Sequence, residues 1–336
     1  MTQNVVITGA SAGVGRAVAQ AYARRGACLA LLARGTAGLA AAADECRELG
    51  ATQVVTHQLD VADADAVQRA ADAASDEFGG IDVWVNDAML SVFAPTWEIT
   101  PAEFRRVTEV NYLGTVHGTL AALRHMRPRG RGTIVQVGSA LAYRGIPLQS
   151  AYCATKHAVQ GFNDSLRAEL LHSSPGVRLS MVQLPAVNTP QFSWVRTRLP
   201  RHPQPVPPIF APEVAARAVL WAADHGVREL NAGGPTVLTR LGNIVAPGLL
   251  DRYLSRRKVG YEGQQTPDPI DLSTWRDNLD KPADDERDHG AEGVFTSTQR
   301  TRSATLWVTT HKPLMGAAFA AGAGLAWAAL TARRAR

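Results

Sequence analysis

The chain has 336 residues, enough to bury a full hydrophobic core, and its 46% hydrophobic and 19% charged residues are typical of a globular protein. The formal net charge of +5 suits an acidic partner. However, no lysine and arginine stripe with interleaved aromatic residues occurs, which argues against nucleic-acid binding. An anionic small molecule or a membrane surface accounts for the positive charge more simply. The three cysteines lack metal-ligand spacing, so we expect reduced packing residues in a cytosolic protein and no metal site.

The amino terminus carries a strand, a glycine-rich turn and a helix in direct succession. Residues 4–8 are apolar, residues 9–15 follow the spacing Gly-x-x-x-Gly-x-Gly, and an alanine-rich helical pattern covers residues 16–25. Glycines let the backbone approach a pyrophosphate, and a helix amino terminus offers unpaired N–H groups with a favourable dipole. A glycine run by itself is more often a tight turn. Its place directly after a first strand favours a phosphate cradle.

Strands and helices alternate along the rest of the first 257 residues. We expect further strands at 28–33, 53–59, 81–85, 133–138, 177–184 and 227–232, and helices at 36–49, 64–78, 100–126, 152–171, 212–224 and 235–256. Thr100, Pro101 and Glu103 form the capping-box pattern that begins the helix at 100–126. This alternation predicts an α/β fold, a Rossmann-type doubly wound parallel sheet with helices on both faces.

A serine, a tyrosine and a lysine stand at positions where one proton-transfer site can form. Tyr152 and Lys156 are four residues apart, so a helix places both side chains on one face. The positive charge of the lysine favours the phenolate, and we expect it to pull the tyrosine pKa down from about 10 toward the working range. Ser139 ends a predicted strand, at the sheet edge where open α/β folds bind ligands. The Tyr-x-x-x-Lys pair alone is more typical of a solvated helix face, and the glycine loop is what favours a site.

Together these motifs resemble the short-chain dehydrogenase/reductase family, over roughly residues 1–255. The matching residues, in the order and at the intervals usual for the family, are Thr8, Gly9, Gly13, Gly15, Asp60, Val61, Asn86, Ala88, Asn111, Ser139, Tyr152 and Lys156. The resemblance implies an oxidoreductase that interconverts an alcohol and a carbonyl by hydride transfer. Tyr152 would act as general acid or base, and Ser139 would orient the carbonyl oxygen. Lys156 would lower the tyrosine pKa and hold the nicotinamide ribose.

The family pattern also implies a proton relay and a set of cofactor contacts. Asn111 would hold a water that passes protons to Lys156, with a plain exposed asparagine as the alternative. The resemblance assigns cofactor binding to Thr8, Gly9, Ser11, Gly13, Val14, Gly15, Arg34, Asp60, Val61, Asn86, Ala88, Tyr152, Lys156, Pro185 and Thr189. Asp60 would accept a hydrogen bond from the adenine amino group, and Thr189 would contact the nicotinamide carboxamide.

Two departures from the family pattern fall in the cofactor pocket. Asp87 and Met89 follow Asn86 where the family has asparagine and glycine, and Ala186 follows Pro185 in place of a glycine. Both departures touch the shape of the pocket, whereas the proton-transfer residues are intact.

The end of the second predicted strand bears on the choice of cofactor. NAD-specific sites place an aspartate or glutamate there, about 20 residues past the glycines, to bind the ribose 2′-hydroxyl. This chain has Ala33 and then Arg34, and an arginine can pair with the 2′-phosphate of NADP through two hydrogen bonds. The sequence therefore favours NADP (NADPH), with NAD as the other candidate. A solvated loop charge is the simpler alternative for Arg34.

The remaining segments carry less chemistry. The proline-rich residues 185–212 predict a long irregular loop beside the active site, which suits a substrate lid. Residues 258–312 are acid-rich, with ten Asp/Glu against three Lys/Arg over 262–292, and predict a solvated, irregular linker rather than a second domain. Residues 313–332 hold no charge and are rich in alanine and glycine. They are long enough to span a bilayer, so they predict either a membrane anchor or a helix docked on protein.

These observations predict a cytoplasmic NADP-dependent oxidoreductase with a small-molecule carbonyl or alcohol substrate and a C-terminal helix that could associate with a membrane. The alternative, from another functional class, is a catalytically idle dinucleotide-binding regulator or membrane-associated scaffold. The intact Ser139, Tyr152 and Lys156 argue against that alternative. Family members usually pair through the helices expected here at 100–126 and 152–171, so the resemblance implies a homodimer or homotetramer.

Overall fold

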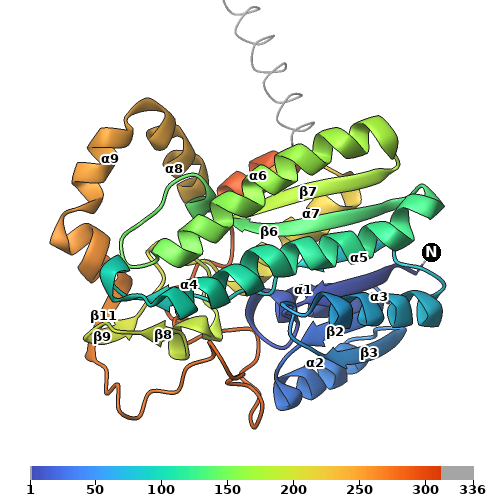
Figure 1. Cartoon of the computed structure of the whole chain (residues 1–336), viewed down its shortest axis with the longest axis horizontal. Coiled ribbons are helices and arrows are strands. Elements are labelled where there is room, and N and C mark those ends of the chain that lie inside the picture. Colours follow the sequence, from blue (N-terminus) through green and yellow to red (C-terminus); the bar gives the residue numbers. More distant parts are fainter. Residues whose placement is uncertain (1, 312–336) are drawn as a thin grey trace, which may run out of the picture.

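The computed structural model describes residues 2–311, and a parallel seven-stranded sheet forms its centre (Figure 1). The strands are β1 Asn4–Thr8, β2 Cys28–Ala33, β3 Gln53–Gln58, β4 Val83–Asn86, β6 Gly132–Ser139, β7 Val177–Leu184 and β10 Glu229–Asn231. They lie in the order β10-β7-β6-β4-β1-β2-β3, and each neighbouring pair is parallel. The order reverses between β1 and β4, and such a reversal is the point at which doubly wound sheets bind ligands.

Helices cover both faces of the sheet, as the alternating pattern predicts. One face packs against α1 Gly13–Ala23, α2 Thr36–Glu48 and α7 Pro212–His225, and the other against α3 Ala64–Phe78, α5 Gly114–Arg129 and α6 Ser150–Ser173 (Figure 1). Successive residues of β1 serve opposite cores, with Val5 and Ile7 in the first and Val6 in the second, and all three are fully buried. The predicted doubly wound fold is confirmed.

The helix expected at 100–126 contains a break in its regular repeat. It begins as α4 Pro101–Thr108 with the predicted capping box, in which Thr100 Oγ1 accepts from the Glu103 N–H (3.3 Å) and the Glu103 carboxylate accepts from the Thr100 N–H (2.8 Å). A π-helical turn over Glu109–Leu113 follows, and α5 continues from there. A π-helical turn adds a residue to the helical repeat, and such turns are frequent at functional sites. This one contains Asn111.

Two helices replace the single helix expected at 235–256. Helix α8 Gly234–Val245 ends and helix α9 Pro247–Leu254 begins at Ala246, whose φ of −147° and ψ of 60° are not helical. Proline has no N–H to donate and its ring clashes with the preceding turn, so a helix does not run through it undisturbed. Pro247 instead occupies the first position of α9, where proline is well tolerated.

The proline-rich segment 185–212 is mostly irregular, as expected, and two short strands anchor it. Strand β8 Arg196–Thr197 pairs with β5 Val92–Phe93, and strand β9 Arg201–Pro203 pairs with β11 Gln265–Pro269. Backbone hydrogen bonds to segments far away in the sequence therefore hold this loop in place.

Residues 262–300 pack onto the domain, which corrects the expectation of a solvated segment. Apart from β11 they are largely irregular, and α10 Ala304–Thr310 follows them (orange to red in Figure 1). Leu279 is 1% exposed and shares a core with α3 and α5. The acidic side chains find basic partners on the domain, since Arg196 pairs with both Asp277 (3.0 Å) and Asp280 (2.8 Å).

The uncharged segment 313–332 lies outside the described residues. Within residues 2–311, no helix is both long enough and apolar enough to cross a membrane. The membrane anchor therefore stays a prediction.

Candidate active site

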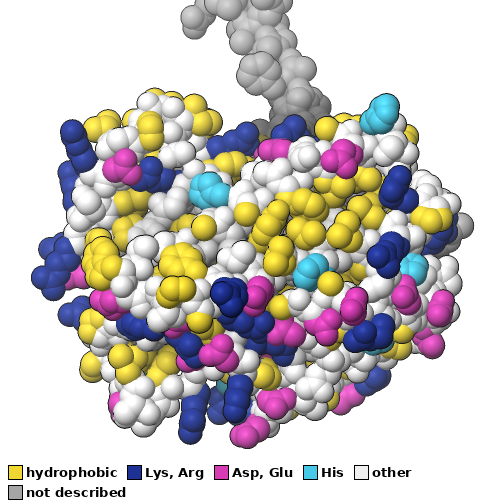
Figure 2. All heavy atoms as spheres, viewed as in Figure 1, with side chains coloured by type: hydrophobic (Ala, Val, Ile, Leu, Met, Phe, Trp, Pro, Cys, Tyr) yellow, Lys and Arg dark blue, Asp and Glu magenta, His cyan; other side chains and the backbone are white. Residues whose placement is uncertain are grey.

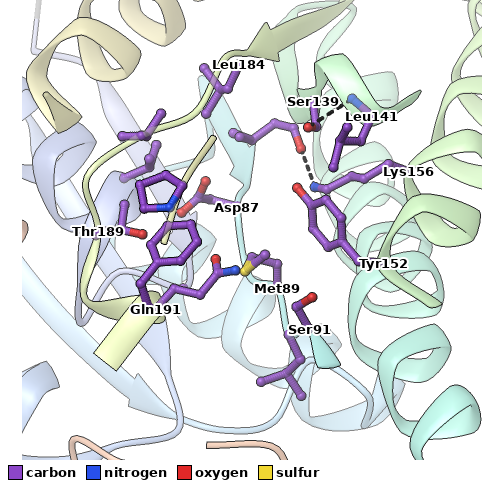
Figure 3. A pocket seen from close by; sticks show the side chains of 18 of the residues that line it. Asp87, Met89, Ser91, Ser139, Leu141, Tyr152, Lys156, Leu184, Thr189 and Gln191 are labelled. Atoms are coloured by element: carbon purple, nitrogen blue, oxygen red, sulfur yellow. Dashed lines mark hydrogen bonds between the residues drawn. The ribbon is translucent and has the colours of Figure 1, made fainter. Parts of the chain in front are cut away.

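A cavity of about 520 Å³ lies at the carboxyl edge of the sheet, beside the point where the strand order reverses (Figure 3). Its walls come from the loops after β1, β2, β3, β4, β6 and β7 and from the first turns of α6. The predicted site residues that line it are Gly9, Ser11, Gly13, Val14, Arg34, Asp60, Val61, Ala88, Ser139, Tyr152, Lys156, Pro185 and Thr189. The fold thus brings motifs from most of the domain to one cavity.

Ser139, Tyr152 and Lys156 form one group on the cavity wall (Figure 3). Ser139 is the last residue of β6, and the other two lie one turn apart near the start of α6. Lys156 Nζ lies 5.5 Å from the centroid of the Tyr152 ring and donates a 2.8 Å hydrogen bond to the Val137 carbonyl. Ser139 Oγ accepts from the Leu141 N–H (3.2 Å), and its hydroxyl faces the Tyr152 phenol (Figure 3). The tyrosine and the lysine therefore share the helix face that their spacing predicts.

Burial dominates the ionisation of this group. It raises the pKa of Tyr152 above the ordinary value of 10.0, the nearby Ser139 hydroxyl lowers that pKa, and the charge of Asp87 raises it further. Burial also lowers the pKa of Lys156, and the Asp87 carboxylate opposes this shift. The expectation of a lowered tyrosine pKa is therefore corrected. The phenol is a protonated donor at neutral pH because burial disfavours the phenolate and the Asp87 charge adds to this effect.

Asp87 places a carboxylate between Lys156 and the glycine loop. Its carboxylate lies against the first turn of α1, where a Cβ built on Gly15 would lie 2.9 Å from Asp87 Oδ2, and its own N–H donates to Thr8 Oγ1 (3.0 Å). Burial raises the pKa of Asp87, whereas Lys156 and the Gly15 N–H lower it. Sequence reasoning recorded this position only as a departure from the family pattern. Its charge belongs to the site because β1, β4 and α6 meet here.

Two of the predicted cofactor contacts, Thr8 and Asn86, lie behind the cavity wall. Thr8 Oγ1 accepts from the N–H groups of residues 87 and 88 (3.0 and 3.2 Å), which fixes the turn after β4. Asn86 is 4% exposed, and its carboxamide accepts from Trp84 Nε1 (2.8 Å) and donates to Gln136 Oε1 (2.9 Å). Both side chains shape the wall from inside the protein, and their contact with a cofactor stays a prediction.

Asn111 also lies behind the wall and is 1% exposed, which excludes the alternative of an exposed helix asparagine. Its Oδ1 accepts from the Leu90 N–H (2.7 Å), and its Nδ2 donates to the Leu90 carbonyl (2.9 Å) and to Thr155 Oγ1 (3.1 Å). These bonds join the π-helical turn to the loop after β4 and to the residue directly before Lys156. The water relay stays a prediction.

Gly15 lets the first turn of α1 lie directly on the glycine loop. A Cβ at this position would lie 2.3 Å from the Gly9 carbonyl oxygen, so Gly15→Ala must push two backbone segments apart. We expect a loss of ~1–3 kcal/mol in the free energy of unfolding, the usual cost of overpacking, measured by urea denaturation. Gly161→Ala in α6 is the control, because a Cβ there meets nothing within 4 Å among the described residues. Alanine should stabilise that helix by up to ~1 kcal/mol, and equal stabilities of the two variants would contradict the close contact.

Arg34, the first residue after β2, is held by residues 262–300, which are called the C-terminal extension from here on. Its guanidinium donates to the carbonyls of Asn278 and Leu279, with a distance of 3.2 Å to the latter. Arg106 donates to the same Leu279 carbonyl (3.1 Å) and pairs with Asp60. Burial lowers the pKa of Arg34, and the charge of Asp60 opposes this shift. The alternative of a solvated loop charge is therefore excluded for Arg34.

The extension also crosses the glycine loop. The Gly290 carbonyl accepts from the Gly13 N–H (3.1 Å), and Asp288 pairs with Arg16 of α1 (2.8 Å). Thr189 lies across the cavity from the tyrosine and lysine, and a Cβ built on Gly13 would lie 3.3 Å from its side chain (Figure 3). Residues 278–290, expected to form a solvated linker, thus border the site along the glycine loop.

The fold and this cavity define a nicotinamide-dinucleotide-dependent oxidoreductase, with a glycine loop at the first helix and ionisable side chains at the carboxyl edge of the sheet. The family model described as short chain dehydrogenase matches residues 3–199. The chain belongs to the short-chain dehydrogenase/reductase family, whose members act on CH–OH or C=O groups with NAD(P).

Several known proteins are similar to the chain. An uncharacterized oxidoreductase of Bacillus subtilis, YxnA, is 31% identical over 330 residues, which are 97% of this chain and 90% of that protein. Human dehydrogenase/reductase SDR family member 7 is 37% identical over 186 residues, 54% of this chain and 55% of that protein. The X-ray structure of an alcohol dehydrogenase from the archaeon Thermococcus sibiricus, complexed with 5-hydroxy-NADP, matches with a TM-score of 0.60 and 33% identity. That match covers 69% of this chain and 96% of the other.

Proposed function

We propose that this protein interconverts an alcohol and a ketone or aldehyde with a nicotinamide dinucleotide, and that Tyr152 transfers the proton. The observation that carries the proposal is the grouping of Ser139, Tyr152 and Lys156 in a cavity that the glycine loop borders. The residues fit a dinucleotide, since Gly9 and Gly13 adopt φ values of 71° and 58° beside the amino terminus of α1, and the cavity runs from there to the end of β2. Such a dinucleotide, when bound, supplies or accepts hydride.

In the reducing direction, the carbonyl carbon gains a hydride and the carbonyl oxygen gains a proton. Ser139 donates a hydrogen bond to that oxygen and orients it. Tyr152, which burial keeps protonated, gives its proton to the same oxygen and so completes the alcohol. The Lys156 ammonium stabilises the phenolate that remains until it is reprotonated from solvent. In the oxidising direction the phenolate takes the proton from the alcohol.

The substrate end of the cavity is apolar. Its lining includes Leu141, Ile146, Phe192, Trp194, Val206, Leu250 and Tyr253. Burial of apolar surface is the main source of affinity in such a pocket, so an apolar carbonyl compound or alcohol is the proposed substrate class. Several of these residues belong to the segment 186–212, which supports its proposed role as a substrate lid.

Arg34 is the residue on which the sequence bases its prediction of NADP rather than NAD, and this preference stays a prediction. The NADP derivative bound to the Thermococcus sibiricus enzyme supports it. The carbonyls of residues 278 and 279 oppose it, because they already accept hydrogen bonds from the Arg34 guanidinium. Reduction of a carbonyl compound with either dinucleotide is consistent with a cytoplasmic location, which is the location proposed for the catalytic domain.

We further propose that copies of this chain pair through α5 and α6 as a dimer or tetramer. Figure 2 shows apolar side chains gathered over these two helices. Leu120 of α5 and Leu171 of α6 are 52% and 65% exposed. Contiguous exposed apolar surface of this kind marks interaction sites more often than solvated faces.

The proposed activity is tested with the full chain and a panel of ketones and aldehydes of increasing apolar size, by following the oxidation of NADPH and NADH. Turnover of at least one member, and faster turnover of the more apolar ones, is the expected result. If a dinucleotide binds but no member of the panel is reduced, the idle regulator becomes the better description.

A further inference from the structure

The C-terminal extension places Asp284 at the end of the cavity nearest β2. Asp284 is 7% exposed and lines the cavity together with Ala33 and Arg34. Its backbone carbonyl accepts from the Gly38 N–H (2.9 Å), which fixes it against the first turn of α2. Within residues 2–311, its carboxylate oxygens form no hydrogen bond or ion pair, although the Asp284 charge acts at longer range on Arg34. Buried polar groups in native proteins are nearly always partnered, so a carboxylate of this kind facing a cavity indicates a ligand that brings the donor.

The Asp284 carboxylate fills the space that side chains at positions 35 and 38 would take, and both of these residues are glycines. A Cβ built on Gly35 would lie 1.9 Å from Asp284 Oδ1, and a Cβ built on Gly38 would lie 2.5 Å from Asp284 Oδ2. Gly35 is the second residue after β2, so Asp284 lies directly beyond the end of that strand. In NAD-specific dinucleotide folds, an aspartate or glutamate at the end of the second strand binds the ribose 2′-hydroxyl. Here the C-terminal extension brings a carboxylate to the same place.

The donors around Asp284 are engaged elsewhere. Arg34 donates to the carbonyls of residues 278 and 279 and forms no ion pair with Asp284. The Thr36 N–H at the start of α2 donates to Asp285 Oδ1 (3.0 Å). A 2′-phosphate at this position would therefore meet the negative charges of two carboxylates, while the arginine and amide donors nearby are already in use.

We propose that Asp284 selects the dinucleotide: its carboxylate accepts a hydrogen bond from the adenosine ribose 2′-hydroxyl and repels a 2′-phosphate. This rests on the proposed function, because it takes the dinucleotide to lie along the glycine loop with its adenosine at β2. It reverses the preference that Arg34 alone predicts, so NADH binds more tightly than NADPH. The extension supplies a specificity-determining residue.

Equilibrium titration of the full chain with NADH and with NADPH, followed by nicotinamide fluorescence, tests this assignment. Asp284→Asn keeps the shape of the side chain and removes its charge. We expect it to raise the affinity for NADPH about tenfold and to lower the affinity for NADH about threefold. Asp284→Ser should shift the ratio in the same direction and guards against misfolding of the first variant. Asp271→Asn is the control, because it removes the same charge from an exposed turn of the extension and should leave both affinities within about twofold.

An unchanged ratio of the two affinities in both Asp284 variants would overturn the assignment. If the unaltered chain still binds a dinucleotide and reduces a carbonyl, the proposed function would survive that result. A loss of affinity for NADPH alone in Arg34→Ala would also overturn the assignment, since the guanidinium would then face the 2′-position. If the unaltered chain binds neither dinucleotide, the proposed function and the role of Asp284 fail together.

Discussion

Tyr152→Phe is expected to lower turnover by ~10²–10⁴-fold, the range typical of lost general acid–base catalysis. The variant keeps the aromatic ring but has no proton to transfer. Burial raises the pKa of Tyr152, so at neutral pH its phenol is a proton donor and the loss falls on the chemical step. Steady-state kinetics with the best carbonyl of the panel measures the effect. Dinucleotide affinity, measured separately, should be nearly unchanged because the glycine loop is intact.

Tyr143→Phe is the matched control for this variant. The Tyr143 hydroxyl accepts from Gln183 Nε2 (3.3 Å), and the residue does not line the cavity. Removal of that hydroxyl should leave turnover close to that of the unaltered chain. Near-normal turnover of Tyr152→Phe would rule out the assigned proton donor, and equal losses in the two variants would indicate a general packing defect.

The parts of the fold that could be predicted are those with a local signal. The six residues of β2 are all buried, and together with Ala27 they form an unbroken apolar run between Gly26 and Arg34. Thr100 and Glu103 lie three residues apart, which is the spacing of the capping box that the structure contains. The i, i+4 spacing of Tyr152 and Lys156 likewise needs only a helix to bring the side chains together. The glycine loop follows the same logic, since its strand and helix are its direct neighbours.

The missed features depend on contacts between distant parts of the chain. Composition marked residues 262–292 as solvated because it counts charges and not their partners, and Asp288 finds Arg16 only in the folded chain. The carbonyls that hold Arg34 come from residues 278 and 279, and nothing near Arg34 in the sequence indicates them. The tyrosine pKa was expected to fall because sequence spacing shows the lysine but neither the burial nor Asp87.

Asp87→Asn is expected to strengthen dinucleotide binding by up to about tenfold at pH 8, where the Asp87 carboxyl is mostly charged because burial raises its pKa to about 7. Asp87 lines the cavity beside the Gly15 N–H, which lowers the pKa of its carboxyl, at the place where the pyrophosphate is proposed to lie. At an effective dielectric constant of ~20, two unit charges ~6 Å apart repel by ~2–3 kcal/mol, and Lys156 offsets part of this. Asparagine keeps an acceptor for the Gly15 N–H and removes the charge. Calorimetric titration of both proteins with NADH measures the difference.

The same carboxylate should give dinucleotide binding a pH dependence, and its raised pKa fixes the sign. Burial raises the pKa of Asp87 from its ordinary value of 3.8 to about 7. The carboxyl is therefore neutral well below pH 7 and becomes charged as the pH rises through that value. The pyrophosphate is anionic throughout, so the affinity of the unaltered chain should fall across that window. Asp87→Asn has no proton to lose there and should stay flat until Lys156 deprotonates, at a lower pH than in the unaltered chain because the lysine has lost its partner. If the affinity of the unaltered chain rises with pH across the window, the Asp87 carboxylate does not face the pyrophosphate.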